Sequence, residues 1–175
     1  MNSDQSSIVM MGVAGCGKSS LGVAVAKQMG LDLIEGDDHH SPESLKKMRQ
    51  GIALTDEDRD GWLAALAKAL QEHPEGVVLT CSALKRIYRD RLRCAAQGLR
   101  FVYLDISPEQ ALARVTERAS SHFFSTSLVD SQFTTLEPPT AEAGVLRVDA
   151  MLPLGQLQMQ VCAWLQNHHE AISNS

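Results

Sequence analysis

The chain has 175 residues, of which 44% are hydrophobic and 21% are charged, and its formal net charge is -5. These values are typical of one globular domain, so we expect a single domain over residues 1–175. The acidic balance excludes a nucleic-acid coat protein, which needs a basic face. The four cysteines are widely spaced and no apolar run is long enough to span a membrane. We therefore expect a cytoplasmic protein with reduced thiols and no membrane partner.

Short apolar runs alternate with helical patterns along the chain. The apolar runs predict five strands, at Ile8–Met11, Leu31–Ile34, Val77–Cys81, Phe101–Ile106 and Val145–Val148. Helical spacing and capping signals predict helices at Lys18–Met29, Pro42–Arg49, from about Thr55 through Leu70, and at about Arg86–Ala96, Pro108–Ala119 and Leu154–His168. This alternation is typical of an α/β fold, with helices on both faces of a parallel five-stranded sheet.

One stretch, residues 120–140, breaks this alternation. It is rich in serine, ends in a pair of prolines, and is too long for a plain connection between a helix and the last strand. We interpret residues from about 119 to 140 as a mobile lid.

A glycine-rich loop follows the first predicted strand at once. The run Gly12-Val13-Ala14-Gly15-Cys16-Gly17-Lys18-Ser19 fits the pattern G-x-x-x-x-G-K-[ST]. Its glycines let backbone N–H groups turn inward around phosphate oxygens, and the helix that begins at Lys18 adds partial positive charge. We therefore expect these residues and Ser20 to bind the phosphates of ATP. Lys18 would bridge the β- and γ-phosphates, and the Ser19 hydroxyl would bind Mg²⁺.

Acidic residues after the second predicted strand distinguish between classes of phosphate-binding protein. The third strand ends without an acid, whereas Asp37 and Asp38 follow the second, and the N-K-x-D motif of G proteins is missing. This arrangement favours a small-molecule kinase. In it, Asp37 would be the general base for an acceptor hydroxyl and a water-mediated Mg²⁺ ligand. The alternative, that Asp37 and Asp38 only cap the next helix, stays open.

Arginines gather after the third strand and before the lid. Arg86, Arg89 and Arg93 share one face of a predicted helix, which suits a carboxylate or the phosphates. A solvated surface is the alternative for the last of them. Arg118 is our candidate for a catalytic residue that reaches over the γ-phosphate, with Arg114, one turn earlier, as the alternative.

These motifs together resemble one family, the gluconokinases, which are P-loop small-molecule kinases related to shikimate kinase. Besides the phosphate loop, the resemblance rests on Gly36-Asp37-Asp38-His39-His40, on Cys81-Ser82-Ala83-Leu84-Lys85, on Ser131-Gln132-Phe133 and on Leu136-Glu137-Pro138. It implies the P-loop kinase fold and transfer of the ATP γ-phosphoryl group to the terminal hydroxyl of D-gluconate. Mg²⁺ and a homodimer are implied as well.

Gluconate offers a carboxylate and a row of hydroxyls, and several charged and polar residues of the chain suit it. Arg59, Lys85 and Arg89 are our candidates for its carboxylate, and Asp37 and His40 for its hydroxyls. Two alternatives remain: a kinase for another small polyhydroxy acid, such as a different aldonate or shikimate, and a nucleotide-gated regulatory module.

Overall fold

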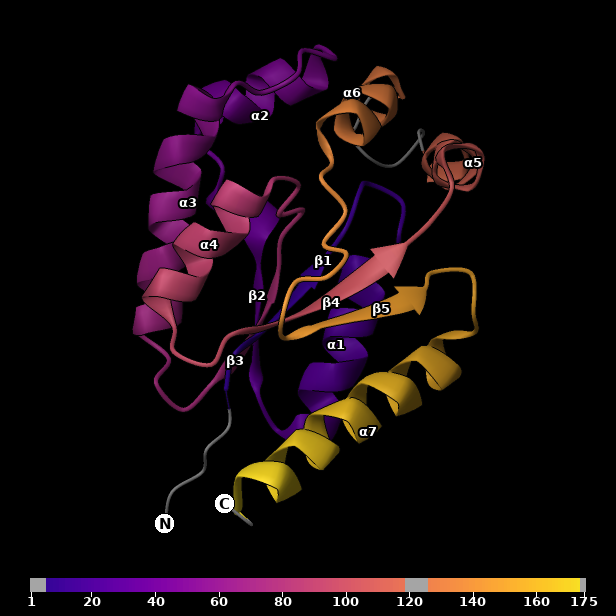
Figure 1. Cartoon of the computed structure of the whole chain (residues 1–175). Helices are drawn as coiled ribbons and strands as arrows, with labels where there is room; N and C mark the ends of the chain where they lie inside the picture. The colour runs from indigo at the N-terminus through magenta and orange to yellow at the C-terminus, as the bar shows by residue number, and fades with distance from the viewer. Residues whose placement is uncertain (1–5, 119–125, 174–175) are drawn as a thin grey trace.

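A parallel sheet runs through the middle of the molecule (Figure 1). The computed structural model describes residues 6–118 and 126–173, and within them five strands pair in the order β2-β3-β1-β4-β5. The strands are β1 (Ile8–Met11), β2 (Asp32–Glu35), β3 (Val77–Thr80), β4 (Arg100–Asp105) and β5 (Val145–Asp149). Each lies within one residue of its predicted bounds, so the predicted α/β fold is confirmed.

Helices cover both faces of this sheet. They are α1 (Lys18–Met29), α2 (Pro42–Arg49), α3 (Asp56–Gln71), α4 (Arg86–Ala95), α5 (Pro108–Arg118), α6 (Ser127–Thr135) and α7 (Leu154–Ser173), with a short 3₁₀ helix, η1 (Gly36–His39), after β2. Figure 1 shows α3 and α4 on one side of the strands and α1 and α7 on the other. None of the helices in the described ranges is long and apolar enough to cross a membrane.

The central strand β1 is a continuous run of apolar residues, and its place in the sheet explains why. Its side chains alternate between the two faces. Ile8 and Met10 pack with α1 and α7, whereas Val9 and Met11 pack with α3 and α4. Because both faces are covered, all four residues of the strand are buried.

Capping residues set the starts of α2 and α3, as the sequence predicts. The side chain of Ser41 accepts a hydrogen bond from the Ser44 N–H, and Pro42 opens the helix. Thr55 and Asp58 form a capping box, in which each side chain accepts the backbone N–H of the other residue. Both helices therefore begin at fixed points beside the carboxyl ends of the strands.

The predicted lid contains a helix that the sequence did not indicate. Residues 119–125 of the lid lie outside the described residues. Helix α6 follows them, and its residues Leu128 and Val129 are buried. Its sequence is rich in serine and threonine, which are weak helix formers. Packing of this apolar pair and contact with α5 therefore account for the helix.

Candidate active site

A pocket of about 550 Å³ opens at the carboxyl ends of the strands. Open α/β sheets bind their ligands at this edge. Residues from the phosphate loop, η1, α2, α3, α5 and α6 line it. Figure 1 shows α2, α5 and α6 around the end of the sheet toward which β2 and β4 point.

The phosphate loop forms one wall of this pocket. Gly15 and Gly17 have φ angles of 82° and 96°, which L side chains rarely adopt. A side chain at Gly15 would also meet the Ala111 carbonyl of α5, 2.9 Å from the added Cβ. The Nζ of Lys18 donates hydrogen bonds to two carbonyls of the loop, at 3.0 and 3.1 Å. The ammonium group therefore sits inside the curve of the loop.

Most of the predicted phosphate-binding residues line the pocket, but three do not. Those that do are Ala14, Gly15, Gly17, Lys18, Ser19 and Ser20. Val13 and Cys16 are buried beneath the loop, and Gly12 leads into it from β1. Gly12, Val13 and Cys16 therefore shape the loop through their backbone rather than through exposed side chains.

Glu35 is a site residue that the sequence reasoning missed. Its Oε2 accepts hydrogen bonds from the Ser19 hydroxyl, at 3.0 Å, and from the Thr80 hydroxyl, at 2.6 Å. Thr80 in turn accepts the N–H of Gly36 at 3.2 Å. A carboxylate thus stands beside the hydroxyl predicted to bind Mg²⁺. These oxygen donors are of the kind that Mg²⁺ prefers.

The pairing of β2 with β3 brings Glu35 to this position. Glu35 is the register partner of Thr80, so their side chains share one face of the sheet. Gly36 follows, where an added Cβ would lie 2.1 Å from the Thr80 carbonyl oxygen. The acidic run from Glu35 to Asp38 was the feature of the sequence that could have indicated Glu35 as a site residue. Only the strand pairing shows that its first member faces Ser19.

The residues of η1 and the residue that follows it form another part of the pocket lining. Asp37, Asp38 and His40 all line the pocket. The helix α2 is capped by Ser41, so neither acid caps that helix. The Asp37 side chain is 73% exposed, and its Oδ1 lies 3.8 Å from Nε2 of His40. An exposed carboxylate at the pocket edge suits the predicted general base.

His40 is held deep in the pocket wall. Its side chain is 5% exposed, and its ring stacks on Trp62 with 4.3 Å between centroids. The indole Nε1 of Trp62 donates to the Gly36 carbonyl at 2.7 Å, which fixes the stacking partner. Burial lowers the pKa of His40, although Asp37 acts in the opposite direction. The imidazole is therefore neutral at pH 7.

One ring nitrogen of His40 is buried and has no partner. Among the described residues, Nδ1 is the buried side-chain atom that lacks a hydrogen bond. Such orphaned polar atoms are costly in a folded protein. The described residues thus leave the hydrogen-bonding capacity of Nδ1 unused.

Arg59 lines the pocket, whereas Lys85 lies behind it. The Arg59 side chain donates to the Tyr88 hydroxyl at 3.3 Å, and that hydroxyl donates to Asp56. Lys85 binds the same carboxylate, with 2.9 Å between Nζ and Oδ1. Hydrogen bonds from Tyr88 and Lys85 lower the pKa of Asp56. The structure therefore places Arg59 at the pocket and makes Lys85 part of its support.

Arg89 is not in the pocket, which corrects the prediction that it binds a substrate carboxylate. Its side chain is fully buried, and all five of its N–H groups are used. They bind the backbone oxygens of Ala83, Leu84 and Glu137 and both carboxylate oxygens of Glu142. Burial would raise the pKa of Glu142, but hydrogen bonds from its arginine partners lower it overall. Arg89 thus joins α4 to the segment before β5.

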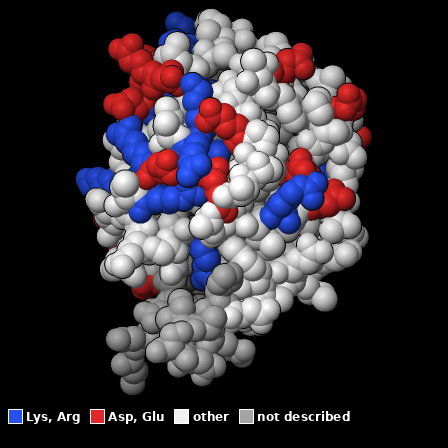
Figure 2. All heavy atoms as spheres, in the orientation of Figure 1, with Lys and Arg blue, Asp and Glu red and all other residues white. Residues whose placement is uncertain are grey.

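The other arginines of α4 are paired with acids as well. Arg86 lies 3.7 Å from Asp90, Arg91 lies 2.6 Å from Asp60, and Arg93 lies 2.9 Å from Glu142. Figure 2 shows basic and acidic side chains interleaved over the side of the molecule that α3 and α4 form. The predicted basic face is therefore a set of ion pairs outside the pocket.

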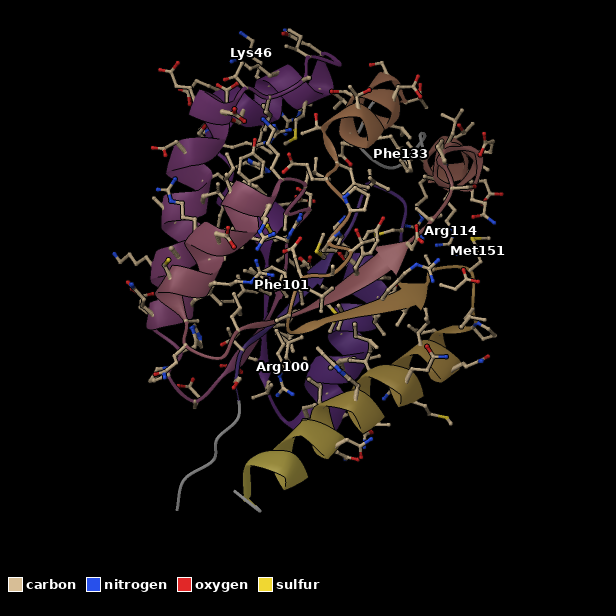
Figure 3. All side chains as sticks on the ribbon, viewed as in Figure 1. Lys46, Arg100, Phe101, Arg114, Phe133 and Met151 are labelled. Carbon is tan, nitrogen blue, oxygen red and sulfur yellow. The ribbon has the colours of Figure 1, made fainter. Side chains whose placement is uncertain are left out.

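The two candidate arginines of α5 have different positions. Arg114 donates to the carbonyls of Gly15 and Cys16, at 3.2 and 3.3 Å, and to that of Ala150 at 3.1 Å. Figure 3 shows it beneath α5, near the end of β4. Arg118 lines the pocket instead. Arg114 thus braces the outside of the phosphate loop, and Arg118 remains the candidate for contact with phosphate.

The sequence of this chain matches one family model and several known proteins. A family model for shikimate kinase matches residues 14–134, which include all the pocket-lining residues. A probable gluconokinase of Schizosaccharomyces pombe is 46% identical over 143 residues, which are 77% of this chain and 74% of that protein. A gluconokinase of Gluconobacter oxydans is 42% identical over 144 residues, covering 81% and 80% of the two chains.

A solved structure resembles nearly all of the chain. The crystal structure of a gluconokinase from Sinorhizobium meliloti superposes with a TM-score of 0.88 at 45% sequence identity. The match covers 96% of this chain and 95% of that chain. The likeness in sequence and the likeness in fold therefore concern the same residues.

Proposed function

Since the chain belongs to the gluconokinases, within the wider shikimate kinase family, we propose that its pocket phosphorylates D-gluconate. The γ-phosphoryl group of ATP passes to the terminal hydroxyl, giving 6-phospho-D-gluconate and ADP. One observation carries this proposal: a single pocket is lined both by the phosphate loop and by the exposed carboxylate of Asp37, with His40 beside it. Family membership further implies a homodimer in the cytoplasm, and both of these stay predictions.

The phosphate side of the pocket binds and orients ATP. The loop N–H groups and the start of α1 hold the phosphates, and Lys18 lies where charge develops on the β- and γ-phosphates. Arg118 is the second cation proposed to face the transferred group. Both side chains stabilise negative charge that grows in the transition state.

The structure suits Mg²⁺ at Ser19 and Glu35. The Ser19 hydroxyl donates its proton to the carboxylate, so the lone pairs of the serine oxygen remain available for a cation. We propose that these two residues hold the ion, Glu35 directly or through water, in place of the predicted contact from Asp37. When bound, Mg²⁺ neutralises charge on the phosphates.

The acceptor side binds gluconate and takes its proton. Asp37 accepts the proton of the terminal hydroxyl of gluconate. As it does so, the hydroxyl oxygen bonds to the γ-phosphorus, and the bond from that phosphorus to the ADP oxygen breaks. Neutral His40 hydrogen-bonds a second hydroxyl through Nδ1. Arg59, held by Tyr88, pairs with the carboxylate. Lys85 acts through Asp56 and does not touch the substrate.

A coupled assay of ADP release tests this function. We expect release to require both gluconate and Mg²⁺ and to be much slower with other aldonates or with shikimate. Asp37→Asn should lower kcat by about 10²-fold or more, because it removes the proton acceptor. The control Asp90→Asn, an exposed acid of α4, should keep the wild-type rate.

Two results would contradict the proposal. Faster turnover of another sugar acid would make that compound the substrate. ADP release without any acceptor, unaffected by Asp37→Asn, would favour a nucleotide-gated module.

A further inference from the structure

The side chain of Gln132 joins helix α6 to the phosphate loop. Its Oε1 accepts a hydrogen bond from the backbone N–H of Ala14, with 2.7 Å between the two atoms. A backbone N–H can only donate, so the amide oxygen must face the loop and Nε2 must point away from it. Both residues line the pocket.

The surroundings of α6 hold Gln132 in place. Within the helix, Val129 is buried in the core, and the carbonyl of Gln132 accepts the Leu136 N–H at 2.8 Å. Beyond the helix, the Glu137 N–H donates to the Leu84 carbonyl at 2.7 Å, and the Glu137 side chain accepts the first N–H of α4 at 2.8 Å. Gln132 is therefore one turn from a segment that is fixed to the body of the protein.

The amide nitrogen of Gln132 is available to a ligand. Nε2 makes no hydrogen bond to any residue between 6 and 118 or between 126 and 167. It carries two N–H donors at the wall of a pocket whose loop binds phosphate. Because the loop N–H already fixes the amide, these donors need little reorganisation when a phosphate oxygen arrives.

We propose that Gln132 is a further catalytic residue. Its Nε2 donates to an oxygen of the γ-phosphoryl group during transfer, while its Oε1 keeps the N–H of Ala14 in place. Charge spreads over the equatorial oxygens of the transferred group in the transition state, and a preorganised neutral donor stabilises it. This inference rests on the proposed phosphoryl transfer at the same pocket.

Two substitutions separate the functions of the amide. Gln132→Glu keeps an oxygen for the Ala14 N–H but removes the donor and adds charge. Gln132→Met keeps the length of the side chain but removes both hydrogen bonds and adds no charge. We expect kcat to fall about 10²-fold in each variant, with the gluconate KM within about twofold of wild type.

ADP affinity distinguishes a catalytic role from a structural one. ADP lacks the γ-phosphoryl group, so its Kd should stay within about twofold of wild type in Gln132→Met. The matched control is Gln110→Glu, because Gln110 also accepts a backbone N–H, that of Ser107 at 3.1 Å, and lies outside the pocket. This control should keep the wild-type kcat.

The outcomes separate this inference from the function on which it rests. Wild-type kcat in Gln132→Met would overturn the catalytic role, whatever the charged variant does. A fall in kcat accompanied by an equal loss of ADP affinity would make Gln132 a structural brace and would also overturn it. Failure of the wild-type enzyme to phosphorylate gluconate in the same assay would instead contradict the proposed function.

Discussion

Two hydroxyl groups, those of Ser19 and Thr80, donate to the same carboxylate oxygen of Glu35. The carboxylate is thereby oriented from the sheet side, and the serine oxygen is turned toward the pocket. Replacing a residue that holds a metal ligand in place commonly lowers metal affinity or activity by about 10–100-fold. Glu35 fills this position because β3 ends in a threonine rather than an acid.

Glu35→Gln tests this position. We expect the Mg²⁺ concentration for half-maximal activity to rise about 10–100-fold, because the neutral amide holds a cation less well. The measurement is a Mg²⁺ titration of ADP release at saturating gluconate. Asp32→Asn, at the exposed opposite end of the same strand, is the control and should leave the titration unchanged. An unaltered Mg²⁺ dependence in Glu35→Gln would exclude the residue from the metal site.

Individual site residues differ in how far the sequence predicts them. The phosphate loop was predictable because its chemistry lies in eight consecutive residues. Asp37 and His40 lie in a second short motif, which runs from Gly36 to His40. Glu35 was missed because its role depends on the register of β2 against β3. Sequence spacing within one segment does not contain that information.

At the scale of elements, helix α4 shows how a residue pattern and its environment can disagree. Its arginines recur at helical spacing, as a ligand-binding face would require. Arg89 nevertheless points into the protein, where Glu142 lies 2.6 Å from its Nη2. That partner is 53 residues further along the chain. The helix was therefore predictable, but the residues that it would face were not.

Arg89→Leu should destabilise the protein rather than weaken gluconate binding. Removing Arg89 leaves the buried Glu142 with Arg93 alone and leaves the carbonyls of Ala83, Leu84 and Glu137 without this donor. Breaking a buried ion pair in this way costs about 3–5 kcal/mol. Urea unfolding measures this loss, and the gluconate KM of the folded variant should match wild type. Arg91→Leu, whose exposed partner is Asp60, is the control and should cost less than about 1 kcal/mol. Normal stability with a raised gluconate KM would return Arg89 to the acceptor site.

At the scale of the whole molecule, the pocket draws on both helical layers. The loop and α1 belong to one layer, whereas α3, which carries Arg59 and Trp62, belongs to the other. A bound nucleotide therefore adds contacts to the folded state that the unfolded chain lacks. The sequence predicted the layers through strand and helix alternation, but it contained no direct sign of the strand order.

ATP should accordingly raise the unfolding temperature. At 100 times its Kd, a ligand stabilises the folded state by about 2.7 kcal/mol, which corresponds to roughly 5–10 °C for a domain of this size. Lys18→Met should lose most of this increase, because it removes the cation inside the loop. Lys27→Met, at the exposed end of the same helix, should retain it. A full thermal shift in Lys18→Met would contradict the assigned phosphate site.

The long-range contacts of the phosphate loop also bear on how the protein is made. The loop precedes both of its long-range partners in the chain, so it is synthesised before they are. Two contacts that fix it arrive much later, because Arg114 binds Gly15 from 99 positions away and Gln132 binds Ala14 from 118 positions away. Closing such long segments costs chain entropy and slows folding. The contacts that fix the nucleotide site are therefore complete only after Arg114 and Gln132 have both been synthesised.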